Sequence, residues 1–157
     1  MQERSREGGA IAERPTSQGS FKALTILLVE DEGFVRQVTG KVLQSEGYRV
    51  LSTGTAAEAE RKFRRDADGI DLLLTDVVLP DRDGLTLAND LRTIRPRLKT
   101  IFMSGYPENS VTQNGLHKQE EVYLHKPFST GFLIGKIRLV SQKGVRTANG
   151  EEDKVRS

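Results

Sequence analysis

The feature that most constrains the fold is an apolar run that ends on a carboxylate and is followed at once by a turn signal. Residues 70–76 read Ile-Asp-Leu-Leu-Leu-Thr-Asp, and the three leucines show no polar alternation, which is typical of a strand covered on both faces. Pro80 and the pair Asp83-Gly84 follow. They favour a turn because proline fixes φ and glycine accepts positive φ. Asp76 is therefore predicted where a buried strand emerges at the edge of a sheet.

Four other short apolar runs predict four further strands, at residues 24–29, 48–52, 100–103 and 122–124. Between the first two, Val35, Val38 and Val42 recur at helical spacing before Gly47, which stops the helix. Further helices are predicted at 56–63 with Thr55 as N-cap, at 85–94, weakly within 107–121, and after Ser129 or Thr130 as N-cap. Strand and helix thus alternate five times over short connections. This pattern predicts an α/β fold with a doubly wound, five-stranded parallel sheet and five helices.

Polar residues follow several of these strands at the point where each strand ends. Asp31, Asp76, Ser104 and Lys126 each fall at the end of a different strand. Parallel strands joined by right-handed crossovers point the same way, so their carboxyl ends share one edge of the sheet. Ligands of such sheets bind at that edge. The four side chains are therefore expected to converge.

The chemistry of the converging residues points to phosphoryl transfer. Glu30, Asp31 and Asp76 would repel one another unless a cation intervened. Mg²⁺ suits such a site because it accepts carboxylate oxygens and keeps waters that a phosphate can displace. The ammonium of Lys126 and the hydroxyl of Ser104 could hold phosphoryl oxygens. With Asp76 as the acceptor, these groups form a phosphoryl-transfer site.

Composition narrows the classes of protein that fit. The 24 basic and 22 acidic residues nearly balance, so a net charge of +2 gives no basic footprint for nucleic acid. The chain has no cysteine and no apolar segment long enough to span a bilayer. We expect a cytoplasmic protein without nucleic-acid or membrane partners. Residues 1–20 are predicted to be a disordered leader, 21–141 the folded domain and 142–157 a polar tail, which is too short for a DNA-binding output domain.

The motifs resemble those of the receiver domain of response regulators in two-component signalling. They are Val29-Glu30-Asp31-Glu32, Leu74-Thr75-Asp76, the run from Leu79 to Gly84, Met103-Ser104-Gly105-Tyr106 and Lys126-Pro127-Phe128. They occur in the family's order over about residues 24–140. The resemblance implies a CheY-like, flavodoxin-like receiver fold with strand order 2-1-3-4-5. The style of the motifs is that of receivers in hybrid sensor histidine kinases.

The resemblance also implies roles for the acidic residues. Asp76 would take a phosphoryl group from a histidine kinase or a histidine phosphotransfer protein. Asp31, Asp76 and the main-chain carbonyl of Val78 would hold Mg²⁺. Glu30 stands where the family more often has aspartate, and it would contact the ion directly or through water.

The remaining roles concern the phosphoryl oxygens and the response to them. By resemblance, Ser104 and Lys126 would bind the phosphoryl oxygens, and Tyr123 would be the switch aromatic that swings inward when the serine moves. The Lys126–Pro127 bond would be cis. Such a domain is not an enzyme with a separate substrate; it promotes its own aspartate phosphorylation and dephosphorylation, and a conformational switch relays the signal.

Two other functions compete with this interpretation. Asp81 and Asp83 after an apolar strand resemble the Asp-x-Asp motif of haloacid-dehalogenase-type phosphatases, with Asp81 as nucleophile and Asp83 as acid and base. Pro80 argues against that motif, because the strand must run up to the nucleophile. The plainer expectation is that Asp81 is a solvated turn residue and Asp83 supports the turn or the helix start. A pseudo-receiver that serves only as an interaction module is the third hypothesis, disfavoured by the intact acceptor, serine and lysine.

Overall fold

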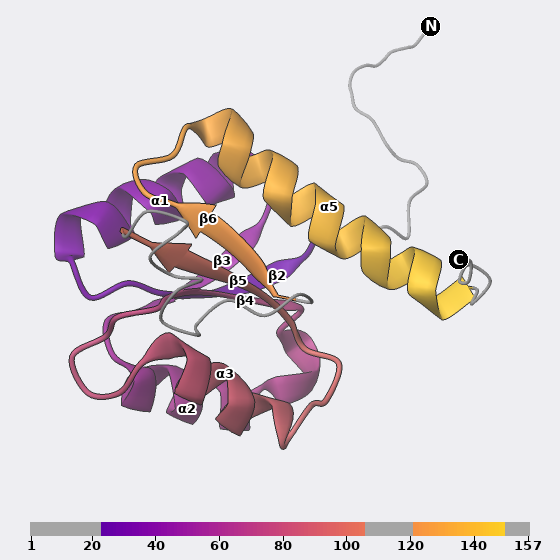
Figure 1. Ribbon diagram of the computed structural model, residues 1–157, viewed down its shortest axis with the longest axis horizontal. Helices are drawn as coiled ribbons and strands as arrows, with labels where there is room; N and C mark the ends of the chain where they lie inside the picture. The colour runs from indigo at the N-terminus through magenta and orange to yellow at the C-terminus, as the bar shows by residue number, and fades with distance from the viewer. Residues whose placement is uncertain (1–22, 106–120, 150–157) are drawn as a thin grey trace, which may run out of the picture.

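Five parallel strands form a sheet at the centre of the molecule (Figure 1). The computed structural model describes residues 23–105 and 121–149. The strands are β2 (Thr25–Val29), β3 (Arg49–Thr53), β4 (Leu72–Asp76), β5 (Lys99–Ser104) and β6 (Val122–His125). Their order across the sheet is β3-β2-β4-β5-β6, and every neighbouring pair is parallel. In chain order this is 2-1-3-4-5, so the predicted doubly wound α/β fold is confirmed.

Helices cover both faces of the sheet. Within the described residues they are α1 (Gly33–Ser45), α2 (Ala56–Arg65), α3 (Gly84–Arg92) and α5 (Thr130–Asn149), with a short 3-10 turn, η1, at Ala67–Gly69. Figure 1 shows α1 and α5 on one face and α2 and α3 on the other. The weak helix predicted within 107–121 falls almost wholly outside the described residues. None of the helices in the described part of the chain is long and apolar enough to cross a membrane.

The leucine-rich strands are explained by two apolar cores, one on each face. Along β2, Leu27 and Val29 belong to the core that also contains Phe63 of α2, whereas Ile26 and Leu28 belong to the core under α1 and α5. All five side chains are fully buried. A strand buried on both faces has no solvent-facing position, which is why these runs lack polar alternation.

The helix boundaries bear out most of the predicted start and stop signals. Thr55 caps α2 and Ser129 caps α5, each side-chain oxygen accepting a 3.1 Å hydrogen bond from the backbone N–H three residues ahead. Gly47 follows α1 with a φ of +97°, a left-handed conformation that favours glycine. The last helix continues to Asn149, past the boundary predicted at residue 141. A helix satisfies its own backbone hydrogen bonds, so it can continue through polar sequence without apolar periodicity.

The carboxyl ends of the strands meet at one edge of the sheet. Asp76 of β4 pairs in register with Met103 of β5, and Ser104 pairs with His125 of β6. The Lys126 N–H donates to the Ser104 carbonyl at 2.7 Å, and the Lys126–Pro127 bond is cis, as the resemblance implied. The side chains that end these strands are therefore placed side by side.

Candidate functional site

Three carboxylates gather at the carboxyl edge of the sheet. Glu30 and Asp31 follow β2, and Asp76 is the last residue of β4. One carboxylate oxygen from each lies within 4.8 Å of the others. Glu30 and Asp76 are buried, with 1% and 5% of their surface exposed, whereas Asp31 faces solvent. The structure thus gives a cluster that is closed on the protein side and open on the side of Asp31.

The ammonium of Lys126 lies between two of these carboxylates. Its Nζ atom is 2.6 Å from Glu30 Oε1 and 2.7 Å from Asp76 Oδ1. The second oxygen of Glu30, Oε2, accepts a 3.1 Å hydrogen bond from the Glu32 N–H. Sequence reasoning reserved Lys126 for the phosphoryl oxygens. In the structure the lysine also offsets part of the charge of the acidic cluster, because its ammonium contacts both buried carboxylates.

Burial and close contact separate the pKa values of the two buried carboxyls. Burial, followed by the hydrogen bond with Glu30, raises the pKa of Asp76 from 3.8 to about 7, against the opposing effect of Lys126. Burial also acts to raise the pKa of Glu30, but hydrogen bonds with Asp76, Lys126 and the Glu32 N–H outweigh it and hold that pKa below its ordinary value. The two carboxyls therefore titrate as an interacting pair, in which Asp76 keeps its proton to a higher pH than Glu30 does.

The carboxylate oxygens of this cluster are suitable ligands for a hard divalent cation. The cluster offers carboxylate oxygens from three residues, and a single ammonium cannot balance three negative charges. Mg²⁺ prefers oxygen ligands and tolerates a site that is open to water on one side. An exposed Asp31 beside two buried carboxylates has this character. Burial is the main cause of the raised pKa of Asp76, and the neighbouring Glu30 carboxyl adds to it.

Ser104 lies at the same edge on the neighbouring strand, and Tyr123 lies one strand further, in register with Phe102. Ser104, the last residue of β5, is 5% exposed. Tyr123 of β6 is half-buried, and its ring centroid is 5.5 Å from that of Phe102. Burial and the nearby charge of Glu121 raise the pKa of the Tyr123 phenol to about 12, so it stays neutral. The structure brings Ser104 to the site, while the switch role of Tyr123 stays a prediction.

The loop from Val77 to Asp83 leaves the end of β4 and returns to it. The Val77 N–H donates to the Met103 carbonyl at 2.9 Å, and the Gly84 N–H donates to the Val77 carbonyl at 2.7 Å. A Cβ atom on Gly84 would lie 2.0 Å from the Asp76 carbonyl oxygen, so only glycine permits this approach. The side chain of Val78 is exposed, and no hydrogen bond among the described residues uses its carbonyl.

Asp81 has a contact that sequence reasoning missed. The expectation of a solvated turn residue is incomplete, because its two carboxylate oxygens accept hydrogen bonds from the Ala56 and Ala57 N–H groups at 3.0 and 2.8 Å. Partial desolvation opposes ionisation, but these bonds outweigh it and lower the pKa of Asp81. Asp83 supports the helix start as expected, with Oδ1 accepting from the Thr86 N–H at 2.7 Å. Neither carboxylate faces the acidic cluster.

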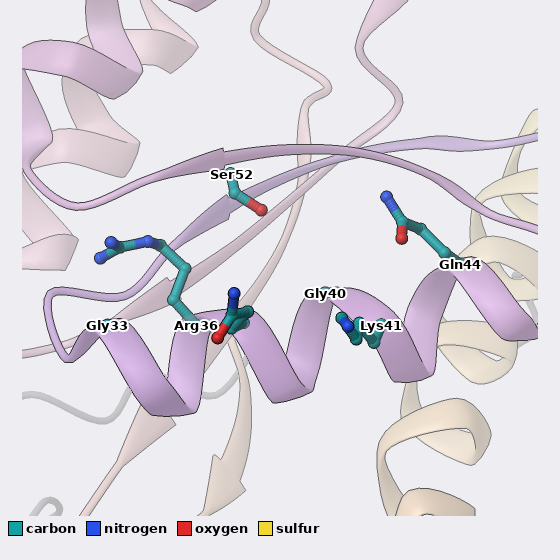
Figure 2. A pocket seen from close by; sticks show the side chains of 7 residues that line it. Gly33, Arg36, Gly40, Lys41, Gln44 and Ser52 are labelled. Atoms are coloured by element: carbon teal, nitrogen blue, oxygen red, sulfur yellow. The ribbon is translucent and has the colours of Figure 1, made fainter.

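Arg36 is a second residue that the sequence did not single out. Its Nη1 atom donates to the Glu30 carbonyl at 2.8 Å and lies 3.5 Å from the Asp31 carbonyl. It thereby fixes the backbone that presents two of the carboxylates. Arg36 also lines a hollow of about 480 Å³ between α1 and β3, over the backbone of Gly40 and beside Ser52 (Figure 2). The residues that line this hollow include no carboxylate, and we assign it no ligand.

An apolar hollow of about 440 Å³ lies on the other side of α1, next to the site. Lys126, whose ammonium contacts Glu30 and Asp76, forms part of its wall. The other lining residues come from α1 and the loop after β6: Phe34, Val35, Val38, Thr39, Pro127 and Phe128. Phe34 is 76% exposed, which is unusual for a large aromatic side chain. An apolar surface of this kind marks a place where another molecule can bind.

The doubly wound parallel sheet and the acidic cluster with its lysine are features of one class of signalling domain. Comparison with known proteins identifies the same class. Residues 26–138 match the response regulator receiver domain family. The chain belongs to this family. It is therefore a receiver domain of two-component signalling.

Individual relatives show how widely this domain is used. The chain is 37% identical over 119 residues to the sensor kinase CckA of Brucella abortus, covering 76% of this chain but only 13% of the kinase. It is 32% identical over 112 residues to the response regulator receiver protein CpdR of the same organism, covering 71% of this chain and 92% of CpdR. A solved receiver domain of the hybrid histidine kinase CckA superposes with a TM-score of 0.64 at 32% identity, over 74% of this chain and 97% of that domain.

Proposed function

We propose that this domain accepts a phosphoryl group on the Asp76 carboxylate in a Mg²⁺-dependent reaction. The donor is the phosphohistidine of a histidine kinase or of a histidine phosphotransfer protein. The observation that supports this most directly is the meeting of Glu30, Asp31, Asp76 and Lys126 at one edge of the sheet, with Ser104 on the next strand.

In this proposal the protein supplies both the nucleophile and the groups that hold the phosphate. Asp76 Oδ attacks phosphorus, the P–N bond to the donor imidazole breaks, and the electron pair leaves with the imidazole nitrogen. The Lys126 ammonium, already 2.7 Å from Asp76, and the Ser104 hydroxyl hold the phosphoryl oxygens. Glu30, Asp31 and the Val78 carbonyl hold Mg²⁺ with Asp76. The bound ion supplies positive charge that favours ionised Asp76 and balances the phosphoryl oxygens.

The product would then change the surface that partners recognise. An aspartyl phosphate adds charge and strong acceptor oxygens, which draw the Ser104 hydroxyl toward it. Tyr123 packs on Phe102, two residues before Ser104 along β5, and we propose that the tyrosine repacks when that serine shifts. This is a population shift between two arrangements, biased by the phosphate.

The apolar hollow beside Lys126 is the place where we propose that the donor protein docks. Its wall includes Lys126, whose ammonium lies 2.7 Å from the acceptor Asp76, and the exposed ring of Phe34 also lines it. A donor helix could bury Phe34 while bringing its histidine to Asp76. Phe34→Asp should therefore slow phosphorylation by a phosphohistidine protein while leaving phosphorylation by acetyl phosphate unchanged. Equal loss with both donors would contradict the docking role.

The central test offers the protein acetyl phosphate with and without Mg²⁺ and follows the aspartyl phosphate by intact mass spectrometry. We expect one phosphoryl group on the wild type with Mg²⁺, and none on Asp76→Asn or after chelation by EDTA. At saturating Mg²⁺, Asp81→Asn should still be phosphorylated. A wild type that stays unmodified would refute the proposal and favour the interaction module, whereas loss only in Asp81→Asn would favour the phosphatase mechanism.

A further inference from the structure

Two consecutive charged side chains fix the loop between β4 and α3 to the neighbouring helices. Asp81 accepts hydrogen bonds from the first two N–H groups of α2, those of Ala56 and Ala57. Arg82 follows directly and bridges two carboxylates, with 2.5 Å contacts to Glu60 of α2 and to Asp90 of α3. The loop is therefore tied to elements that lie 25 residues earlier and 8 residues later in the chain.

The Asp81 contact completes the N-terminus of α2. The first N–H groups of any helix lack partners within the helix and carry its positive dipole end. In α2 the Glu58 N–H donates to Thr55 Oγ1, and the two N–H groups before it donate to Asp81. One cap thus comes from the residue next to the helix, and the other comes from the loop between β4 and α3. Only the second cap couples α2 to that loop.

The same short loop carries a group that the proposed function needs. Val78 lies three residues before Asp81, and its carbonyl is the proposed main-chain ligand of Mg²⁺. On one side Val77 is held by the Met103 carbonyl, and on the other side Leu79 is buried in the core. Beyond Leu79, the next side-chain anchor of the loop is Asp81. If that anchor is removed, residues 79–81 lose their tie to α2, and the Val78 peptide that leads into them is held by fewer contacts.

We propose that Asp81 is a positioning residue for the metal site, because it anchors on α2 the loop that presents the Val78 carbonyl to Glu30, Asp31 and Asp76. This inference rests on the proposed function, since it concerns the Mg²⁺ of that same site. Asp81 does not touch the ion. It acts through the backbone between residues 78 and 81, with Arg82 reinforcing the tie to α2 and α3.

The test compares two variants that each remove a cap from the same helix. Asp81→Ala removes the cap supplied by the loop, and Thr55→Ala removes the cap supplied by the residue next to the helix. Both should lower Tm by a few degrees, roughly 3–5 °C, because each loses side-chain capping of α2. Mg²⁺ affinity is measured on the folded proteins by isothermal titration calorimetry. The Val78 carbonyl carbon is followed by NMR during the same titration.

We expect Asp81→Ala to bind Mg²⁺ about tenfold more weakly, the range typical for partners that orient a metal ligand, and Thr55→Ala to bind within about twofold of the wild type. The Val78 carbonyl resonance should move on Mg²⁺ addition in the wild type and in Thr55→Ala, and move less in Asp81→Ala. Asp81→Asn keeps one acceptor oxygen and should recover part of the affinity. If Asp81→Ala does not fold, Asp81→Asn and Arg82→Met decide the question in the same assay.

Three results would overturn the inference, and they differ from failure of the proposed function. Unchanged Mg²⁺ affinity in Asp81→Ala would show that the loop holds its path without this anchor. Equal weakening in Thr55→Ala would show that the stability of α2, not the tie to the loop, controls the site. A wild type that binds no Mg²⁺ would refute the proposed metal site itself, and with it this inference.

Discussion

Burial of Asp76 should make the protein less stable at neutral pH than in mild acid when divalent cations are chelated. The pKa of Asp76 is raised from 3.8 to about 7 in the folded protein. In the unfolded chain this carboxyl ionises freely near pH 4. Between pH 4 and pH 7 the folded state therefore holds a proton that the unfolded state has released, and the free energy of unfolding falls as the pH rises. Above pH 7 both states are ionised and the effect levels off.

The size of this change in stability follows from the pKa values of Asp76 in the unfolded and folded states. A change from 3.8 to about 7 corresponds to about 4 kcal/mol of stability lost between pH 4 and pH 8. Asp76→Asn removes this titration but keeps the size of the side chain. The variant should therefore match the wild type near pH 4.5 and exceed its stability at pH 8 by about 3–4 kcal/mol. Glu30, whose pKa is lowered, contributes in the opposite sense, but it is present in both proteins.

The assay is urea unfolding of both proteins in EDTA at several pH values between 4.5 and 8. The quantity of interest is the difference in unfolding free energy between variant and wild type, which should grow by up to about 1.4 kcal/mol per pH unit before it levels off. Added Mg²⁺ should stabilise the wild type more than the variant, because the ion binds the ionised folded state. A difference that does not change with pH, or an Asp76→Asn variant that is less stable at pH 8, would refute the assigned burial of charge.

Three further predictions concern single residues. Lys126→Met should lower the rate of phosphorylation by acetyl phosphate about 10²–10³-fold while Mg²⁺ still binds by calorimetry, because the carboxylates remain and the ammonium that holds the phosphoryl oxygens is lost; loss of Mg²⁺ binding would instead make the lysine structural. Gly84→Ala should cost more than about 3 kcal/mol in urea unfolding, since its Cβ would meet the Asp76 carbonyl at 2.0 Å. The matched control Gly135→Ala, on α5 with nothing within 4 Å, should stabilise by about 0.5–1 kcal/mol. Phe63→Ala should cost about 3–5 kcal/mol, because its ring is fully buried between α2 and the sheet, and a cost under 1 kcal/mol would contradict that packing.

The sequence was sufficient to predict the strands and the side chains at their ends. Runs such as Leu72-Leu73-Leu74 are unbroken because both faces of the sheet are covered, and this signal is local. Parallel topology then requires that strand ends meet, so Asp76, Ser104 and Lys126 could be placed together without coordinates. Because parallel strands end at the same edge, the positions of these residues along the chain predicted which side chains meet in the folded protein.

The parts that sequence reasoning missed depend on contacts between distant segments or on weak local signals. Asp81 caps a helix that begins 25 residues earlier, and a carboxylate in a turn looks the same whether or not a helix start lies next to it. Arg36, six residues after Glu30, binds the Glu30 carbonyl, and nothing in its local pattern separates it from a solvated helix arginine. The extension of α5 to Asn149 had no local signal either, because apolar periodicity locates the part of a helix that packs on the sheet and not its full length.

The charges of the site explain why one lysine can serve two states of the protein. The cluster contains the carboxylates of Glu30, Asp31 and Asp76 and the ammonium of Lys126. Without a metal ion, the lysine and the proton on Asp76 each offset one negative charge, which the buried side of the cluster requires. In the proposed function a bound Mg²⁺ ion would offset this charge, so that Asp76 could release its proton and Lys126 could hold the incoming phosphoryl oxygens. The burial that raises the pKa of Asp76, with its predicted cost in stability, thus falls on the same carboxylate that the ion and the phosphoryl group would engage in the proposed function.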